Sequence, residues 1–263
     1  MILASPLGVA LGVAAAAAYG VTAAAASRLS RPATQWLLGA AWLFHGLALG
    51  WELVGLKLFG FAPILSATAW LVLTVYAIES HLYPQLKVRR ILAVLGAAAA
   101  LLAAWFQGRH MPQDVSSSPW LPLHVALALA SYGLFGAAVV HAWIMTRVEK
   151  QIRLAAEPQA DLPLLTLERL TFRFVTAGFA LLSATLLAGL VFGEDLGRPW
   201  RWDHKTVLSV LAWFTFAVLL IGRSRFGWRG RMARRVLYAG AALLLLAYVG
   251  SRFVLEVMLG RSA

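Results

Sequence analysis

A short segment near residue 200 combines aromatic and charged side chains in a pattern that can hold a flat, anionic ligand. Trp200 and Trp202 are one residue apart, and Asp203, His204 and Lys205 follow directly. Indole faces stack on planar conjugated rings, and cations such as Lys205 bind carboxylates. Tryptophan is also enriched at membrane surfaces, so an interfacial aromatic belt is the alternative interpretation. The charged groups beside the indoles favour a ligand site.

Two histidines are candidates for metal ligation at the ends of apolar stretches, because neutral imidazole is a common axial ligand of iron. His124 lies near the start of one such stretch, where a histidine is costly unless it has a use. His204 opens another stretch. It can be a second ligand, or this position can simply be a helix start capped by Asp203.

Two further histidines lie deep within apolar stretches. His45 is near the middle of its stretch and fits either a ligand or a hydrogen-bonded packing residue. His141 follows His124 by 17 residues, about 25 Å along one helix. It fits either a second, inner ligand position or a packing role. His81 and His110 lie at a helix end and in a loop, where we expect them to be solvated.

The elements that position these residues are membrane-spanning helices. Of the 263 residues, 61% are hydrophobic and 13% are charged, whereas soluble domains average about 25% charged residues. The mean hydropathy is +0.76. Eight stretches are long and apolar enough to span a bilayer: 6–27, 33–56, 62–83, 88–106, 121–147, 167–192, 204–222 and 236–258. We therefore predict an all-α, polytopic bundle of about eight transmembrane helices that forms one integral-membrane domain over residues 1–263.

Lysine and arginine predict the orientation of this bundle. Sixteen of the 23 basic residues fall in alternate connections, and seven fall on the other side. The basic side is expected to face the cytoplasm, which places both termini and the Trp200–Lys205 segment outside. The net charge of +12 is thus a topology signal with anionic lipid as its partner, and it does not indicate a nucleic-acid-binding protein.

Several chemistries are absent from the sequence. The chain has no cysteine, which excludes disulfides, thiolate metal sites and covalent C-x-x-C-H heme attachment. We find no Gly-rich phosphate loop, no Ser/His/Asp set and no carboxylate pair. The sequence therefore indicates a binding or transfer protein and does not indicate an enzyme.

The tryptophan-rich segment resembles the WWD motif of the cytochrome c assembly family (CcsA/CcmC type), approximately W-G-x-x-W-x-W-D-P-K-E. The residues that match are Gly197, Trp200, Trp202, Asp203 and Lys205. The residues that depart are Leu196, His204 and Thr206, in place of tryptophan, proline and glutamate. Residues 120–132 are similar to the family's helix with an outer heme-ligand histidine. Residues 227–231 and 248–252 resemble its short YpjD/HemX-like branch.

The resemblance implies a multi-pass inner-membrane protein that binds heme b at the extracytoplasmic face and helps deliver it in cytochrome c assembly. Apocytochrome c or other maturation proteins are the implied partners. In this interpretation His124 and His204 are the axial ligands of a heme over Trp200 and Trp202, and His45 with His141 is the alternative pair. The family places a second outer histidine after the motif, but no histidine follows His204 here.

That departure favours an alternative function, a heme-binding regulator or stabiliser of tetrapyrrole enzymes or of another membrane complex. A small-solute transporter is a further alternative from a different class, which usually has broken helices at mid-membrane. The prolines of this chain that interrupt apolar sequence fall near predicted helix ends, so the heme functions are favoured.

Overall fold

The computed structural model describes residues 5–25, 28, 30–82, 89–110, 118–154, 163–193 and 202–259. It is almost entirely helical, and the chain forms two compact units, residues 1–111 and 112–261. Seven helices among the described residues are long and apolar enough to cross a bilayer. The family resemblance gave no reason to expect two units, and we describe each by itself.

The first unit consists of four helices: α1 (Pro6–Ala24), α2 (Arg31–Leu49), α3 (Phe61–Leu82) and α4 (Arg89–Trp105). The first two begin at serine caps. The Ser5 hydroxyl accepts from the Gly8 amide at 3.3 Å, and the Ser30 hydroxyl accepts from the Ala33 amide at 3.4 Å. A proline in the first turn of each helix completes the start signal. Helix α1 packs against α2 and α4. Helix α3 also packs against α2 and α4.

A short antiparallel pair of strands closes one end of this unit. Strand β1 (Leu58–Phe59) follows α2, and strand β2 (Arg109–His110) follows α4. Gly108, directly before β2, lies very close to β1. A Cβ at this position would lie 2.8 Å from backbone atoms of Phe59, so a residue without a side chain is needed here. The pair was not predicted from the sequence, and it ties together the connections at this end.

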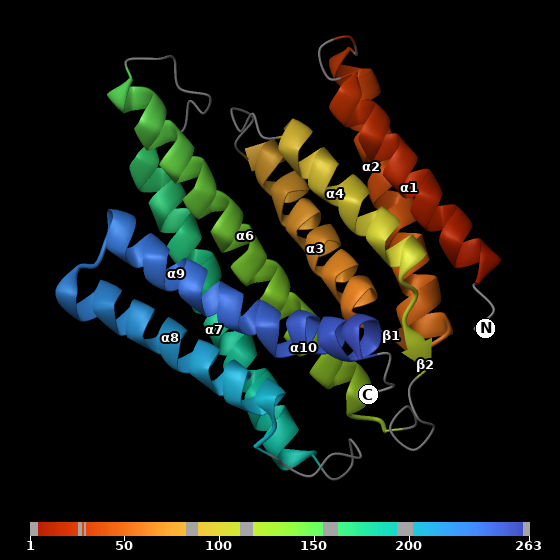
Figure 1. Ribbon diagram of the computed structural model, residues 1–263. Helices are drawn as coiled ribbons and strands as arrows, with labels where there is room; N and C mark the ends of the chain where they lie inside the picture. The colour runs from red at the N-terminus through yellow and green to blue at the C-terminus, as the bar shows by residue number, and fades with distance from the viewer. Residues whose placement is uncertain are drawn as a thin grey trace. The chain divides into compact units, whose positions relative to one another are not determined.

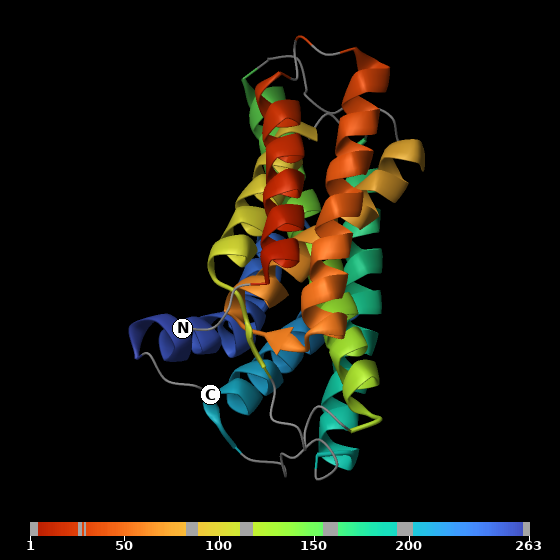
Figure 2. The same ribbon diagram turned by 90° about the vertical axis from the view of Figure 1, so that its right-hand side faces the viewer.

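The second unit also has four long helical segments: α6 (Leu121–Arg153), α7 (Leu164–Val191), α8 (His204–Phe226) and α9 (Gly230–Leu245). Helices α6 and α7 run side by side along most of their length (Figure 1 and Figure 2). Phe135 and Phe216 stack in the core with ring centroids 3.7 Å apart. Gly227 ends α8 with a φ of 64°, a backbone conformation that suits glycine and allows the tight turn into α9.

Three helical segments in the described part of the chain have π-type hydrogen bonding. Segment η1 (Gly50–Gly55) follows α2, and η2 (Leu246–Gly250) and η3 (Val254–Met258) lie on either side of α10 (Ser251–Phe253). Such segments are rare and frequently occur at functional sites. Here η1 extends α2, and the other two extend α9 into one apolar run, Gly230–Met258.

The predicted all-α membrane bundle is confirmed, with differences at the helix ends. The expected span 88–106 is helix α4, whose 17 residues are at the short end for a spanning helix. In the second unit the helices run past the apolar stretches into polar sequence: α6 ends at 153, α7 begins at 164, α8 ends at 226 and α9 begins at 230. Ion pairs stabilise these polar ends. For example, the Arg153 guanidinium lies 3.6 Å from the carboxylate of Glu149, one helical turn earlier in α6.

Candidate functional site

His124 lies in the first turn of α6 and faces α7. A Cβ at Gly189 would be 3.5 Å from the Cε1 atom of its ring. One turn earlier, Trp120 stacks on Phe192 at the end of α7, with ring centroids 4.0 Å apart and an interplanar angle of 10°. The small residue at position 189 therefore leaves room for the imidazole beside this aromatic pair.

The His124 ring has no hydrogen-bond partner among the residues that the structure describes, although its Nδ1 atom is buried. A buried polar atom without a partner costs about 1–3 kcal/mol. The ring as a whole is half-buried, so it can still be reached. An imidazole in this state is chemically suited to bind a group that reaches it from outside the unit, and heme iron is one such group.

The described part of the tryptophan-rich segment is Trp202, Asp203 and the start of α8. The Trp202 side chain is 71% exposed, and His204 is also exposed. Asp203 caps α8 by accepting from the Thr206 amide at 2.8 Å. The cap is therefore present, and it is compatible with either interpretation of His204. Trp200 lies outside the described residues, as do Gly197 and Arg201.

The carboxylate of Asp203 stays charged in this position. Partial burial acts to raise the pKa of Asp203, but the hydrogen bonds from Thr206 and the neighbouring Lys205 and His204 side chains outweigh it. The pKa is therefore held below its usual range. Because the carboxylate serves the helix start, its observed role is to fix the first turn of α8, and with it His204.

Cationic side chains gather around Tyr248 near this end of the second unit. The Lys205 ammonium lies 6.0 Å from the Tyr248 ring centroid, and the Arg252 guanidinium lies 5.7 Å from it. Arg252 also lies 3.6 Å from Glu256, a pairing that the spacing of four residues suggests. The start of α8 and helix α10 thus supply positive charge that can meet carboxylates of a ligand.

His45 occupies a different environment, in the core of the first unit. It is 1% exposed, and its Nε2 atom lies 2.8 Å from the Ser66 hydroxyl oxygen on α3. The Tyr19 ring contacts it edge-on at 5.9 Å. These contacts support the packing interpretation of His45.

His141 lies in the core of the second unit. It is 3% exposed and packs beside the Phe174 ring with centroids 5.3 Å apart. Helix α6 is continuous from His124 to His141, so the two are about 25 Å apart along one axis. The alternative pair, His45 with His141, draws one residue from each unit. His110 is exposed in β2, as expected.

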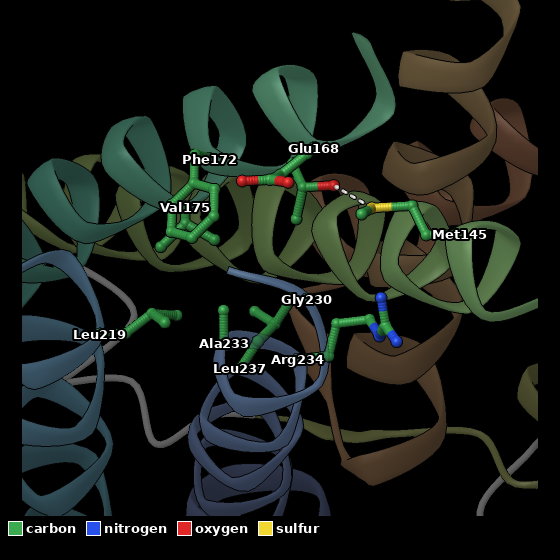
Figure 3. A pocket seen from close by; sticks show the side chains of 10 residues that line it. Met145, Glu168, Phe172, Val175, Leu219, Gly230, Ala233, Arg234 and Leu237 are labelled. Atoms are coloured by element: carbon green, nitrogen blue, oxygen red, sulfur yellow. Dashed lines mark hydrogen bonds between the residues drawn. The ribbon is translucent and has the colours of Figure 1, made fainter. Parts of the chain in front are cut away.

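Charged groups join helices at the opposite end of the second unit. Arg234 of α9 donates two hydrogen bonds to Glu149 of α6, at 2.6 and 2.8 Å. Arg223 pairs with Glu168 at 2.5 Å and lies over the Phe172 ring. The apolar cavity beside these groups has a volume of about 10 Å³, which is room for a single water at most (Figure 3). It is a packing gap and cannot hold a cofactor.

Sequence reasoning missed the residues that come together only through tertiary contact. Gly189, Phe192 and Tyr248 have no local signal that links them to His124 or Lys205. Within the described residues, no three histidine or acidic side chains are grouped closely enough to hold a metal ion by themselves.

Comparison with known proteins places this arrangement in a family. Residues 34–259 match the family described as cytochrome c assembly protein. The inner membrane protein YpjD of Escherichia coli (strain K12) is 34% identical over 160 residues, which cover 60% of this chain and 60% of that protein. A cytochrome c biogenesis protein CcsA of Prochlorococcus marinus (strain MIT 9313) is 27% identical over 209 residues, 63% of this chain and 66% of that one.

A second protein named CcsA, from Mesostigma viride, is 27% identical over 157 residues, 51% of this chain and 52% of its own length. The match thus spans about 60% of the length of the YpjD relatives. No solved structure matches the chain. Because the family match covers most of the sequence and both units, the chain belongs to the cytochrome c assembly protein family, in its YpjD-like branch.

Proposed function

We propose that this chain binds heme b at the end of its second unit where α6 and α8 begin, and that it serves cytochrome c assembly. That end faces the extracytoplasmic side of the inner membrane. The YpjD relatives carry the name of an inner membrane protein, and the CcsA relatives carry the name of cytochrome c biogenesis proteins. Both names support this assignment.

The observation that carries the proposal is the state of His124. It is the one histidine in the described core of α6 and α7 whose ring is reachable and has no partner among the described residues. The resemblance of residues 120–132 to the family's ligand-bearing helix points to the same side chain. When bound, heme supplies an iron atom that accepts imidazole nitrogen as an axial ligand.

The other residues of the site have separate tasks in this proposal. Asp203 holds the first turn of α8, so that the exposed His204 can act as the second axial ligand. Trp202, with Trp200, offers aromatic faces to the macrocycle. Lys205 and Arg252 carry charge opposite to that of the two heme propionates.

An absorption spectrum of the detergent-purified protein tests the proposal. We expect a Soret band at close to one heme per chain, and an alkaline pyridine extract with the spectrum of heme b. His204→Ala should shift the band or lower its intensity, because one axial ligand is lost. A purified, folded protein that neither carries heme nor acquires it from added hemin would overturn the proposal.

The orientation has an independent test, because the chain lacks cysteine. Within the second unit, Pro119 is exposed just before α6 begins, and Ser224 is exposed near the end of α8. An impermeant thiol reagent should label Pro119→Cys in intact cells and should leave Ser224→Cys unlabelled until the cells are lysed. The opposite labelling would overturn the outward placement of the site.

A second function is favoured by one observation, the lack of any histidine after His204. A chain that offers fewer ligands than the family pattern is suited to sense heme and regulate or stabilise a partner enzyme or complex. Co-purification separates the two functions. An apocytochrome or c-type maturation protein is expected for assembly, and a tetrapyrrole enzyme for regulation.

A further inference from the structure

A groove with a volume of about 470 Å³ lies between the end of α6 and the start of α9, at the opposite end of α6 from His124. Its lining includes five cationic side chains and one carboxylate, and we call it the basic groove. Its charged residues are Glu149, Lys150, Arg153, Arg231, Arg234 and Arg235. Neither the family resemblance nor the proposed heme site uses these residues.

The single carboxylate of the basic groove is already engaged. Glu149 accepts two hydrogen bonds from Arg234, at 2.6 and 2.8 Å, and lies 3.6 Å from Arg153. The Arg234 side chain is 9% exposed, so this pair fixes the floor of the groove. It also holds α6 and α9 at a set separation, and the groove is therefore formed before any ligand arrives.

The remaining cations form no ion pair within the described part of the chain. Lys150, Arg231 and Arg235 line the groove from two helices, and only Arg231 is near enough to Glu149 to help lower the pKa of that carboxyl. Helix α9 adds to the positive potential, because its N-terminus starts beside Arg231 with no acidic residue in its first turn. Three converging cations in a preformed concave site are suited to a phosphate group.

The shape of the groove favours a phosphate that belongs to a lipid. From Arg235 the lining continues to Tyr238, about 5 Å further along α9 and into its apolar part. On α6 it continues back to Thr146, about 10 Å before Arg153 and inside the spanning helix. An occupant can therefore place its headgroup among the cations while its acyl chains follow the helices into the bilayer.

We propose that the basic groove is a binding site for the headgroup of an anionic phospholipid. Basic pockets between membrane helices on the cytoplasmic side are known to bind such headgroups. The proposal goes beyond the general attraction of positive loops to membranes, because it assigns the affinity to three residues in one groove. It does not depend on heme binding.

The test compares two triple variants that remove the same charge. Lys150→Gln/Arg231→Gln/Arg235→Gln empties the groove of its unpaired cations and leaves the Arg234–Glu149 pair intact. The matched control is Arg169→Gln/Arg173→Gln/Arg225→Gln, whose residues are exposed on α7 and α8 toward the same end and outside the groove. Both proteins are checked for an unchanged helical spectrum before binding is measured.

Binding is measured calorimetrically on the detergent-solubilised full chain with dihexanoyl phosphatidylglycerol and, separately, with dihexanoyl phosphatidylcholine. We expect the anionic lipid to bind at least tenfold more tightly than the zwitterionic one. The groove variant should lose affinity for phosphatidylglycerol by roughly a hundredfold, which corresponds to three basic residues near a membrane surface. The control should stay within about twofold of the native chain.

Three results would overturn the proposal. The first is unchanged phosphatidylglycerol affinity in the groove variant. The second is an equal loss in the control, which would show diffuse surface charge. The third is displacement of the lipid by inorganic phosphate or glycerol 3-phosphate at matched concentration, which would assign the groove to a soluble phosphate compound.

Discussion

The two units of the chain use different interactions to hold their helices together. In the first unit neutral hydrogen bonds join helices: Trp42 donates to Thr74 at 2.8 Å, and His45 meets Ser66 at 2.8 Å. In the second unit charged pairs join the helices at one end, and at the other end the Nδ1 atom of His124 has no described partner. The Nδ1 atom of His45 also lacks a partner, but the His45 ring is fully buried whereas the His124 ring is half-buried, so the imidazole that a ligand can reach is the one in the second unit.

The largest effect on stability is expected from breaking the charged pair of the second unit. Arg234→Gln removes both hydrogen bonds to Glu149 and leaves that carboxylate only 23% exposed. Breaking such a largely buried pair costs about 3 kcal/mol. Thermal unfolding in detergent should therefore show a clear drop in Tm. The double variant Arg234→Met/Glu149→Leu should recover much of it, because no buried charge then remains unpaired and Arg153, which also loses Glu149, is 58% exposed.

The neutral contact of the first unit gives a smaller effect of the same kind. Ser66→Ala leaves the Nε2 atom of His45 buried without its 2.8 Å partner, at a cost of about 2 kcal/mol. Adding His45→Leu to Ser66→Ala should return most of that loss, since both polar groups are then replaced. If Ser66→Ala unfolds at the temperature of the native chain, His45 is not held as described and the contrast between the units weakens.

Sequence reasoning was most successful where the cause is local. Hydrophobic length predicts the spans, and residue type and position predict the Asp203 cap. It did not reach the pairing of Glu149 with Arg234, which are 85 residues apart, or the β1–β2 pair that joins residue 58 to residue 110. Gly189 and His124 come close only through the tertiary packing of α6 and α7, which no local sequence pattern predicts. The Trp200 and Arg201 part of the motif stays a prediction.

Space at Gly189 gives a spectroscopic test of the site. A Cβ there would be in ordinary contact with the His124 ring at 3.5 Å, so Gly189→Ala should leave the Soret band nearly unchanged. Gly189→Leu adds three more carbons than alanine toward the ring and should shift the band or reduce heme content severalfold. Equal spectra for the leucine and alanine variants would indicate that the imidazole does not face α7.

The helix cap at Asp203 gives the smallest effect. Asp203→Ala loses the hydrogen bond to the Thr206 amide, which is worth about 1 kcal/mol, while Asp203→Asn should retain most of it. Because the pKa of Asp203 is lowered in the folded chain, its contribution is fully present above the ordinary carboxyl pKa. The contribution of Asp203 to the free energy of unfolding is lost as the pH falls through its lowered pKa. Thermal unfolding at pH 7 should rank aspartate and asparagine above alanine.

The account as a whole is tested most directly by the heme content of two single variants, His124→Ala and His45→Ala, purified in parallel. Because the His124 ring has no described partner and His45 is held by Ser66, His124→Ala should carry at least tenfold less heme per folded chain. His45→Ala should keep the heme content and band position of the native protein while unfolding at a lower temperature. Full heme content in His124→Ala together with loss in His45→Ala would contradict the account.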